Sequence, residues 1–207
     1  KNGQMIFKIK KRISIVNSGA GSHSSQWIAR GGGDGTARLW DAETGTELMV
    51  LEGHQDRVRS VVFSPDERRL VTGSADGTAR VWALETGETI LVLEGHSGPV
   101  GRAIWSTDGT LLLTVSGDRT ARIWNAQTGE VVRILHGHTN ALVGGGFSPN
   151  GEWVATMSDD HTLRLWETDY HDFVGYACTR SFRDFTPDER IEFSIDDTPT
   201  CPQVATE

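Results

Sequence analysis

The sequence predicts an all-β chain made of four copies of one four-stranded antiparallel sheet, and three observations support this class. The copies have a fixed period, because the tryptophans Trp40, Trp82, Trp124 and Trp166 stand 42 residues apart each time. Glycine accounts for 24 of the 207 residues, which provides many positions for tight turns. No stretch within residues 1–168 has a helical period, which excludes a parallel α/β sheet.

The second copy, residues 53–94, shows the signals that place each strand. Its apolar and β-branched runs end at the turn sequences Ser-Pro-Asp, Asp-Gly and Thr-Gly, and the next copy opens with Gly-His. We therefore expect strands at 57–63, 69–73, 78–82 and 89–93. Because tight turns join these strands, the copy is predicted to be an antiparallel meander.

The same signals divide the chain into two parts. Residues 1–168 hold the repeats, and residues 169–207 form a tail with nine acidic and three basic side chains, in which we expect two short helices. A strand at 4–10 aligns with the fourth strand of a copy, whereas the last copy stops after its third strand, so the two ends are complementary. The copies are placed at about 11–52, 53–94, 95–136 and 137–168.

Composition and charge exclude several classes of function. The chain carries 20 basic and 28 acidic side chains, a net charge of −8, which argues against nucleic acid as the main ligand. Its purely aliphatic runs, such as 90–93, are too short to cross a bilayer or to form a signal-peptide core, so we expect a cytoplasmic protein. Cys178 and Cys201 show no zinc-ligand spacing, and no metal or other cofactor is predicted; the two could form a disulfide, but we expect thiols.

A motif in residues 53–82 resembles that of a known family. It reads Gly-His, then Phe-Ser-Pro-Asp, then Gly-Ser-Ala-Asp-Gly-Thr-Ala-Arg-Val-Trp, and it recurs at 95–124 and 137–166. This pattern is similar to the WD-repeat β-propeller in its bacterial form. The resemblance implies that each copy is a propeller blade, and that one blade is completed by a strand from the opposite terminus. Four blades could close only with strain, so we favour a C-terminal part of a longer propeller, followed by a homodimer forming an eight-bladed ring.

Each regular copy also holds a histidine, a threonine and an aspartate at fixed positions, which is the composition of a catalytic triad. An active site does not normally recur three times at a fixed period, whereas a packing device must recur in every blade. The resemblance implies a buried hydrogen-bonded tetrad that runs from the tryptophan through threonine and histidine to aspartate. The predicted tetrads are His54, Thr72, Asp76 and Trp82; His96, Thr114, Asp118 and Trp124; and His138, Thr156, Asp160 and Trp166.

The first copy departs from this pattern, because Arg12 and Arg30 stand where the histidine and the threonine are expected. Its basic residues Lys8, Lys10, Lys11 and Arg12 form either a binding patch or, as we favour, the solvated or paired cations of a drifted edge blade.

The resemblance also implies where a partner binds. Frequent contact positions in the family lie three and five residues beyond the Gly-His histidine and immediately before the turn aspartate. Two arginines occupy these positions in the second copy, which predicts an acidic protein or peptide partner. The predicted contact residues are Arg57, Arg59, Ala75, Pro99, Gly101, Gly117, Ala141, Val143 and Asp159.

The tail resembles the segment that ends many large bacterial WD-repeat proteins, through Ala177-Cys178-Thr179-Arg180 and Thr200-Cys201-Pro202. The resemblance implies the C-terminal part of a bacterial signalling or regulatory protein. We therefore predict a non-enzymatic protein–protein interaction scaffold. The first alternative is an autoregulatory sensor domain of an ATPase or a defence-type effector, and a hydrolase built on one of the tetrads is a minor alternative.

Overall fold

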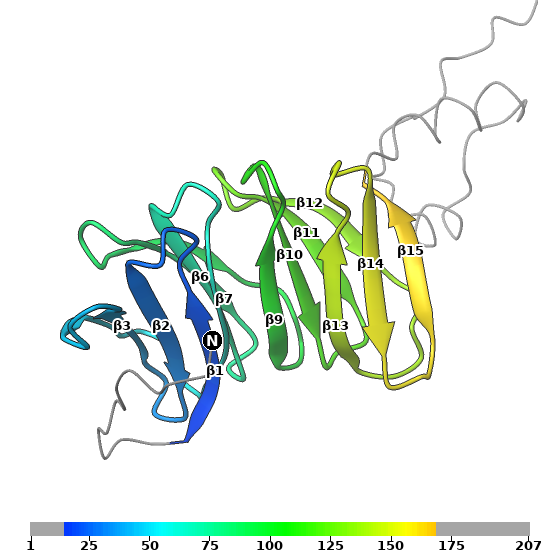
Figure 1. Ribbon diagram of the computed structural model, residues 1–207. Helices are drawn as coiled ribbons and strands as arrows, with labels where there is room; N and C mark the ends of the chain where they lie inside the picture. Colours follow the sequence, from blue (N-terminus) through cyan, green and yellow to red (C-terminus); the bar gives the residue numbers. More distant parts are fainter. Residues whose placement is uncertain (1–14, 169–207) are drawn as a thin grey trace, which may run out of the picture.

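The computed structural model describes residues 15–168, which form fifteen β-strands and contain no helix. The strands make four sheets, and in each sheet they pair antiparallel in chain order (Figure 1). The first sheet holds β1 (Val16–Gly21), β2 (Trp27–Gly32), β3 (Ala37–Asp41) and β4 (Glu47–Leu51). The second sheet holds β5 (Val58–Phe63), β6 (Arg69–Ser74), β7 (Ala79–Ala83) and β8 (Thr89–Leu93).

The third and fourth sheets repeat this plan. The third holds β9 (Val100–Trp105), β10 (Leu111–Ser116), β11 (Ala121–Asn125) and β12 (Val131–Leu135). The described part of the fourth holds β13 (Leu142–Phe147), β14 (Trp153–Ser158) and β15 (Leu163–Glu167). Within residues 15–168 the all-β prediction is therefore confirmed. The strand predicted at 4–10 and the helices predicted in the tail lie outside the described residues.

One turn recurs between the second and third strand of every sheet and shows why the sequence repeats an aspartate there. In the second sheet Asp76 Oδ1 accepts the backbone N–H of Thr78 at 2.9 Å and its hydroxyl at 2.8 Å. The residue between them, Gly77, has a φ of 87°, a left-handed conformation that glycine adopts without steric cost. The aspartate therefore fixes the turn that starts the third strand.

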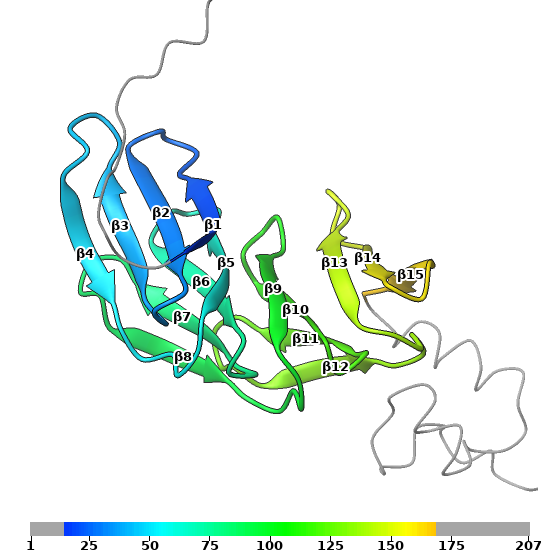
Figure 2. The same cartoon turned by 90° about the horizontal axis from the view of Figure 1, so that it is seen from below.

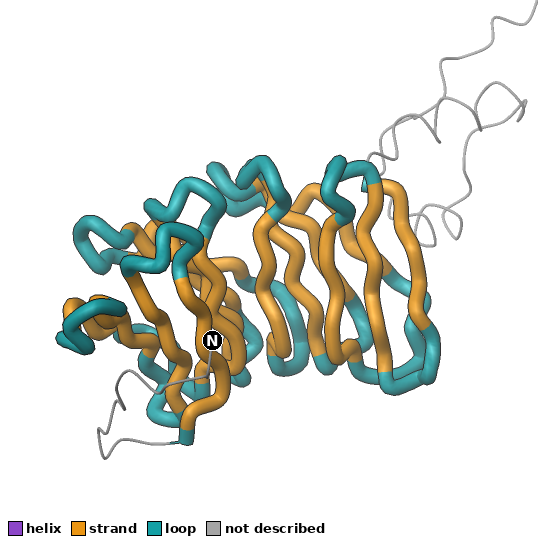
Figure 3. The backbone as a smooth tube through the Cα atoms, in the orientation of Figure 1, coloured by secondary structure: helices purple, strands orange, loops and turns teal. Residues whose placement is uncertain are grey.

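The four sheets stand side by side in an arc, with β1, β5, β9 and β13 along its concave edge (Figure 2). The connecting loops lie along the two rims of this arc (Figure 3). The arc is open, since the first and fourth sheets stand at its two ends. The architecture is thus a row of blades in which each sheet packs only on its neighbours.

The apolar core lies between the sheets. We call the face of a sheet that meets the following sheet its trailing face, and the face that meets the preceding sheet its leading face. Between the second and third sheets, Val71 and Val81 of the trailing face pack with Val100 and Ala103 of the leading face, and all four are 0% exposed. Full burial of a valine or leucine side chain stabilises a fold by roughly 1.5–3 kcal/mol, so these joints hold the row together.

Candidate functional site

The predicted tetrad residues of the second sheet form one hydrogen-bonded chain. His54 Nδ1 lies 2.8 Å from Asp76 Oδ2, and His54 Nε2 lies 2.7 Å from Thr72 Oγ1. The indole Nε1 of Trp82 donates to the same Thr72 hydroxyl at 2.9 Å. The chain therefore links the loop before β5 to the second and third strands of the sheet.

The third and fourth sheets contain the same chain with nearly identical geometry. In the third sheet the three contacts of His96 with Asp118 and Thr114, and of Trp124 with Thr114, are each 2.8 Å. In the fourth sheet they are made by His138, Asp160, Thr156 and Trp166 at 2.7, 2.8 and 2.8 Å. The structure thus brings together all twelve residues that the sequence singled out for the tetrads.

The hydrogen bonds of the tetrad are compatible with a neutral histidine. An indole N–H only donates, so the Thr72 hydroxyl accepts from Trp82. With a neutral imidazole protonated at Nδ1, Nδ1–H donates to Asp76 and the Thr72 hydroxyl donates to Nε2. Burial lowers the pKa of His54 and of His96, against the opposing effect of the aspartate hydrogen bond, and so favours the neutral form.

The tetrad aspartates are held in their charged form. Burial raises the pKa of Asp76, but the backbone N–H of Gln55 and both donors of Thr78 outweigh it, and they lower the pKa to about 2. The pKa values of Asp118 and Asp160 are lowered as well, through hydrogen bonds from Thr120 and Thr162 among others. Each tetrad therefore ends on a carboxylate with several donors.

Accessibility separates these tetrads from a catalytic triad. Thr72, Thr114 and Thr156 are each 0% exposed, and each hydroxyl is occupied by a tryptophan and a histidine. A nucleophile must reach the substrate carbon that it attacks, and these buried hydroxyls have no route to a bound substrate. The geometry therefore fits a packing device within each sheet.

The first sheet lacks this hydrogen-bonded tetrad and has an arginine at the threonine position. The guanidinium of Arg30, at the threonine position, lies 5.9 Å from the ring centroid of Trp40. Asp34 keeps the turn, accepting the Thr36 N–H at 3.2 Å, and it forms an ion pair with Arg38 at 3.6 Å. Arg12 and the neighbouring lysines lie outside the described residues.

Sequence reasoning missed a second recurring contact, made by an arginine two residues before the tetrad tryptophan. Arg122 Nη2 donates to the Gly95 carbonyl at 2.8 Å, and in the second sheet a Cβ added to Gly53 would lie 3.0 Å from Arg80 Nη1. Both glycines precede the tetrad histidine and have positive φ values, 130° and 150°. The period-42 recurrence of arginine in the third strands was the signal that could have found this contact.

The predicted partner-contact residues meet at a groove along the concave edge, which we call the inner groove. It has a volume of about 530 Å³ and includes eight of the nine predicted contact residues. Ala75 is not among its lining residues, and its N–H donates to the Arg57 carbonyl at 3.0 Å. The lining residues are Asn17, Arg57, Arg59, Pro99, Gly101, Gly117, Ala141, Leu142, Val143 and Asp159.

A β-bulge at the same place in every inner strand shapes this groove. The pairing of β5 with β6 shifts register between Val58 and Ser60, which makes Arg59 the extra residue of the bulge. Equivalent shifts make Asn17, Gly101 and Val143 the extra residues of β1, β9 and β13. A bulge bends the strand and re-aims the extra side chain. All four bulge residues line the groove. Asn17 is the one that the sequence reasoning did not include.

Charge is unevenly distributed along the inner groove. Arg57 and Arg59 are exposed on the second sheet, and the Arg57 side chain is 58% exposed with only a loose contact to Asp56 at 3.8 Å. The third sheet contributes Pro99, Gly101 and Gly117, which carry no charge. The groove therefore offers two cationic side chains on the second sheet, a neutral stretch on the third, and one exposed carboxylate, Asp159, on the fourth.

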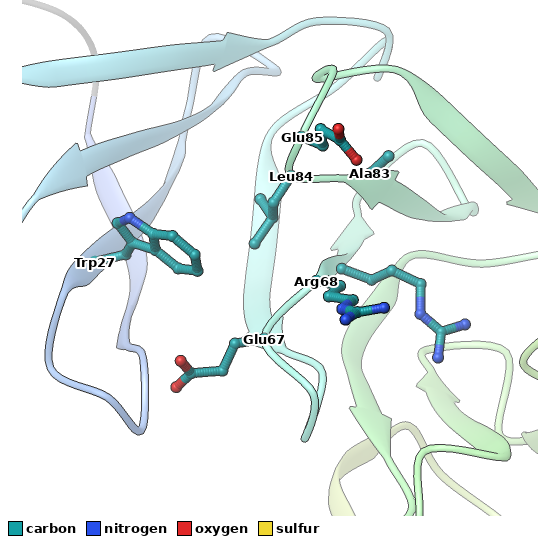
Figure 4. Close-up of a pocket in the computed structure, with 7 residues that line it drawn as sticks. Trp27, Glu67, Arg68, Ala83, Leu84 and Glu85 are labelled. Atoms are coloured by element: carbon teal, nitrogen blue, oxygen red, sulfur yellow. The ribbon is translucent and has the colours of Figure 1, made fainter.

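A second cavity, of about 660 Å³, lies at the opposite rim between the first two sheets. Figure 4 shows Trp27 of the first sheet across from Glu67 and Leu84 of the second. Its polar groups join neighbouring sheets: the Ser24 N–H donates to Glu67 Oε1 at 2.7 Å, and Arg69 stacks on Trp105 at 4.6 Å. These contacts assign this cavity to packing between sheets.

Within residues 15–168, no cluster of three or more histidine, cysteine, aspartate or glutamate side chains could hold a metal ion. The same residues contain no helix that is long and apolar enough to span a membrane.

Comparison with known proteins gives partial matches to several eukaryotic proteins. The chain is 37% identical over 78 residues to ribosome assembly protein 4 of Saccharomyces cerevisiae, covering 32% of this chain and 15% of that protein. It is 47% identical over 55 residues to nuclear distribution protein nudF 2 of Aspergillus clavatus, covering 27% and 12%. It is 49% identical over 39 residues to coronin-7 of Mus musculus, covering 19% and 4%. The chain thus spans at most 15% of the length of each of these relatives.

The family comparison covers most of the chain. The WD40 family, described as WD domain, G-beta repeat, matches residues 8–41, 45–83, 87–125 and 129–167. Each of the last three matched segments begins with the outer strand of one sheet and ends with the third strand of the next sheet. The second match, for example, covers β4 of the first sheet and β5–β7 of the second. Because these four repeats cover more than half of the sequence, the chain belongs to the WD40 repeat family.

Proposed function

We propose that this chain is a non-catalytic protein-interaction platform whose inner groove receives an acidic segment of a partner protein. The observation that carries this proposal is the pair of exposed arginines, Arg57 and Arg59, at the edge of a groove of about 530 Å³. Rigid sheets position this groove, and binding surfaces of this kind belong to loops and strand ends on a fixed scaffold. The WD40 repeats support an interaction module in general.

The chemistry of the groove supports an acidic segment. A guanidinium pairs with a carboxylate through two parallel hydrogen bonds, and arginine is enriched among the residues that contribute most to interfaces. Desolvating Arg59 against an apolar partner would cost free energy, whereas a carboxylate compensates that cost. The net charge of −8 favours a protein over a nucleic acid as the ligand.

The buried threonines support the non-catalytic part of the proposal. A hydrolase would need one hydroxyl in reach of substrate, and Thr72, Thr114 and Thr156 are each enclosed. The sensor alternative has no observation within residues 15–168 that favours it. The bacterial regulatory context and the cytoplasmic location remain predictions, and the tail motifs behind that context lie outside the described residues.

The predicted homodimer that forms an eight-bladed ring is part of this proposal. Its support is the open arc, in which the four sheets of residues 15–168 leave one uncovered face at each end (Figure 2). A ring would hold the inner strands of both copies around one centre.

The groove is tested by selecting peptides from a displayed random library and measuring how the strongest binder responds to charge reversal. We expect selected peptides enriched in Asp and Glu, and we expect Arg57→Glu with Arg59→Glu to weaken their binding more than about tenfold, since each attraction becomes a repulsion. Fluorescence anisotropy measures the affinity, and denaturant unfolding checks the fold.

A matched control uses an exposed arginine away from the groove. Arg59→Glu alone should weaken binding, whereas Arg68→Glu, which makes the same change of charge at the opposite rim, should leave the affinity nearly unchanged. Selected peptides without acidic residues, or an equal loss of affinity in Arg68→Glu, would rule out the groove as the acidic binding site.

A further inference from the structure

The two ends of the arc expose side chains whose counterparts are buried in every internal joint. On the trailing face of the fourth sheet, Leu163 and Leu165 are 60% and 65% exposed, and Met157 is 41% exposed. On the leading face of the first sheet, Val16 is 57% exposed. These are large apolar surfaces in regular strands, which marks them as surfaces for packing.

The repeat identifies what normally covers each of these positions. The counterparts of Leu165 are Leu39, Val81 and Ile123, which the following sheet buries to 3%, 0% and 0%. The counterparts of Val16 are Val58, Val100 and Leu142, which the preceding sheet buries to between 0% and 4%. The end faces therefore have the composition of the two halves of one inter-sheet joint.

The internal joints share a pattern of sizes. In β5, β9 and β13 the last residue is aromatic, and it lies against the first residue of the second strand in the preceding sheet. Phe63 stacks on Trp27 with ring centroids 6.5 Å apart, and Trp105 lies under Arg69. Phe147 shares an apolar cluster with Leu111.

At the two end faces of the arc the leading face has a glycine in place of the aromatic residue, and the trailing face carries the large residue. The position of Phe63 is held by Gly21 in the first sheet, and a Cβ added to Gly21 would meet nothing within 4 Å. The position of Trp27 is held in the fourth sheet by Trp153, whose side chain is left 41% exposed. A large residue on the trailing face thus corresponds to an empty space on the leading face.

A second pair of positions follows the same rule. The trailing face carries Met157 where the first three sheets have Gly31, Gly73 and Val115, and the leading face carries Gly19 where the other three sheets have Val61, Ala103 and Gly145. In the internal joint where the leading face has glycine, at Gly145, the larger Val115 faces it from the third sheet, with its Cγ1 3.2 Å from a Cβ added to Gly145. Met157 and Gly19 would repeat this pairing of a large residue with a glycine.

We propose that the trailing face of the fourth sheet binds the leading face of the first sheet in a second copy of this chain, with Trp153 seated over Gly21. Figure 2 places these two faces at opposite ends of one arc, so a single arc does not supply both halves to itself. The contact is head to tail, and two such joints close a ring of eight sheets. This inference rests on the ring in the proposed function and names the two surfaces that would form each of its joints.

A size swap tests the joint. The chain has a mass of 22.7 kDa, so light scattering after size exclusion should report about 45 kDa for the protein. Gly21→Trp should reduce the mass to that of one chain, because two indoles compete for one space. Adding Trp153→Gly to that variant should restore the dimer, since the indole is then supplied from the other side.

Charge variants test the direction of the joint. Leu165→Glu alone and Val16→Glu alone should each give a monomer, while a mixture of the two should give a dimer, because one joint between unaltered faces remains. Ile90→Glu, an equally apolar exposed position on the outer strand β8, should stay dimeric and serves as the control.

Three outcomes would overturn the proposal. The first is a mass of one chain for the unaltered protein at every concentration, and the second is a Gly21→Trp variant that stays dimeric. The third is a dimer that Leu165→Glu breaks and Val16→Glu leaves intact, which would indicate that two trailing faces meet. None of these outcomes bears on peptide binding by Arg57 and Arg59, so the groove and the joint fail independently.

Discussion

The tetrad histidines illustrate how one residue is determined by its neighbours. His54 has a carboxylate on one ring nitrogen and a hydroxyl on the other, and its side chain is only 1% exposed. A net hydrogen bond contributes about 1 kcal/mol, whereas an orphaned buried partner costs roughly 1–3 kcal/mol. The tetrad therefore contributes more through the cost of breaking it than through the gain from forming it.

His96→Ala is expected to lower the free energy of unfolding by about 1–3 kcal/mol, because it leaves Thr114 and Asp118 without their partner. Urea unfolding followed by tryptophan fluorescence measures the change. His136→Ala removes an exposed histidine and should stay within about 0.5 kcal/mol of the parent. Equal stability of the His96→Ala variant and the parent would contradict a structural role for the tetrad.

Stability is expected to fall in two stages as the pH decreases. The pKa values of His54 and His96 lie below 6.5 in the folded protein, so their contribution is complete above pH 6.5 and declines as the pH falls below it. The pKa of Asp76 is about 2 against 3.8, so its contribution is lost as the pH falls from 3.8 through 2. Urea midpoints from pH 8 to pH 2 measure both stages. A midpoint that stays constant from pH 7 to pH 4 would contradict the neutral-histidine chain.

At the scale of a strand or a turn, the sequence predicted most of what the structure contains. The runs at 57–63, 69–73, 78–82 and 89–93 correspond to β5–β8 within one or two residues at each end. This agreement has a local cause, because turn signals such as Asp76-Gly77 act within a few residues and do not depend on tertiary packing.

The inner-strand bulges could not be predicted in this way. A bulge is defined by two residues facing one across a ladder, so it depends on the register of the pair and not on the composition of one strand. Resemblance predicted Arg59 at a contact position, and it lines the groove, while Asn17 lies in a copy without the Gly-His motif and was missed. The residues that line the groove were therefore predictable where the motif is regular.

At the scale of the molecule, the row of sheets has the character of a repeat protein. Each sheet touches only its neighbours, so stability is the sum of contributions from each sheet and each joint. Among the sheets of residues 15–168, the second and third pack against a neighbouring sheet on both faces, whereas the first and fourth do so on one face. The first sheet also lacks the tetrad that the fourth retains.

These differences predict a gradient of hydrogen exchange along the arc. In the monomeric Gly21→Trp variant, amides of β6 and β10 should exchange most slowly, those of β14 faster and those of β2 fastest, because local opening costs least where one face is uncovered and the tetrad is absent. In the dimer the proposed joint should slow exchange in β2 and β14 and leave β6 and β10 nearly unchanged. Mass spectrometry of peptides from each strand measures both series. Protection of β2 equal to that of β10 in the monomeric variant would show that Arg30 and Arg38 stabilise the first sheet as well as a tetrad does.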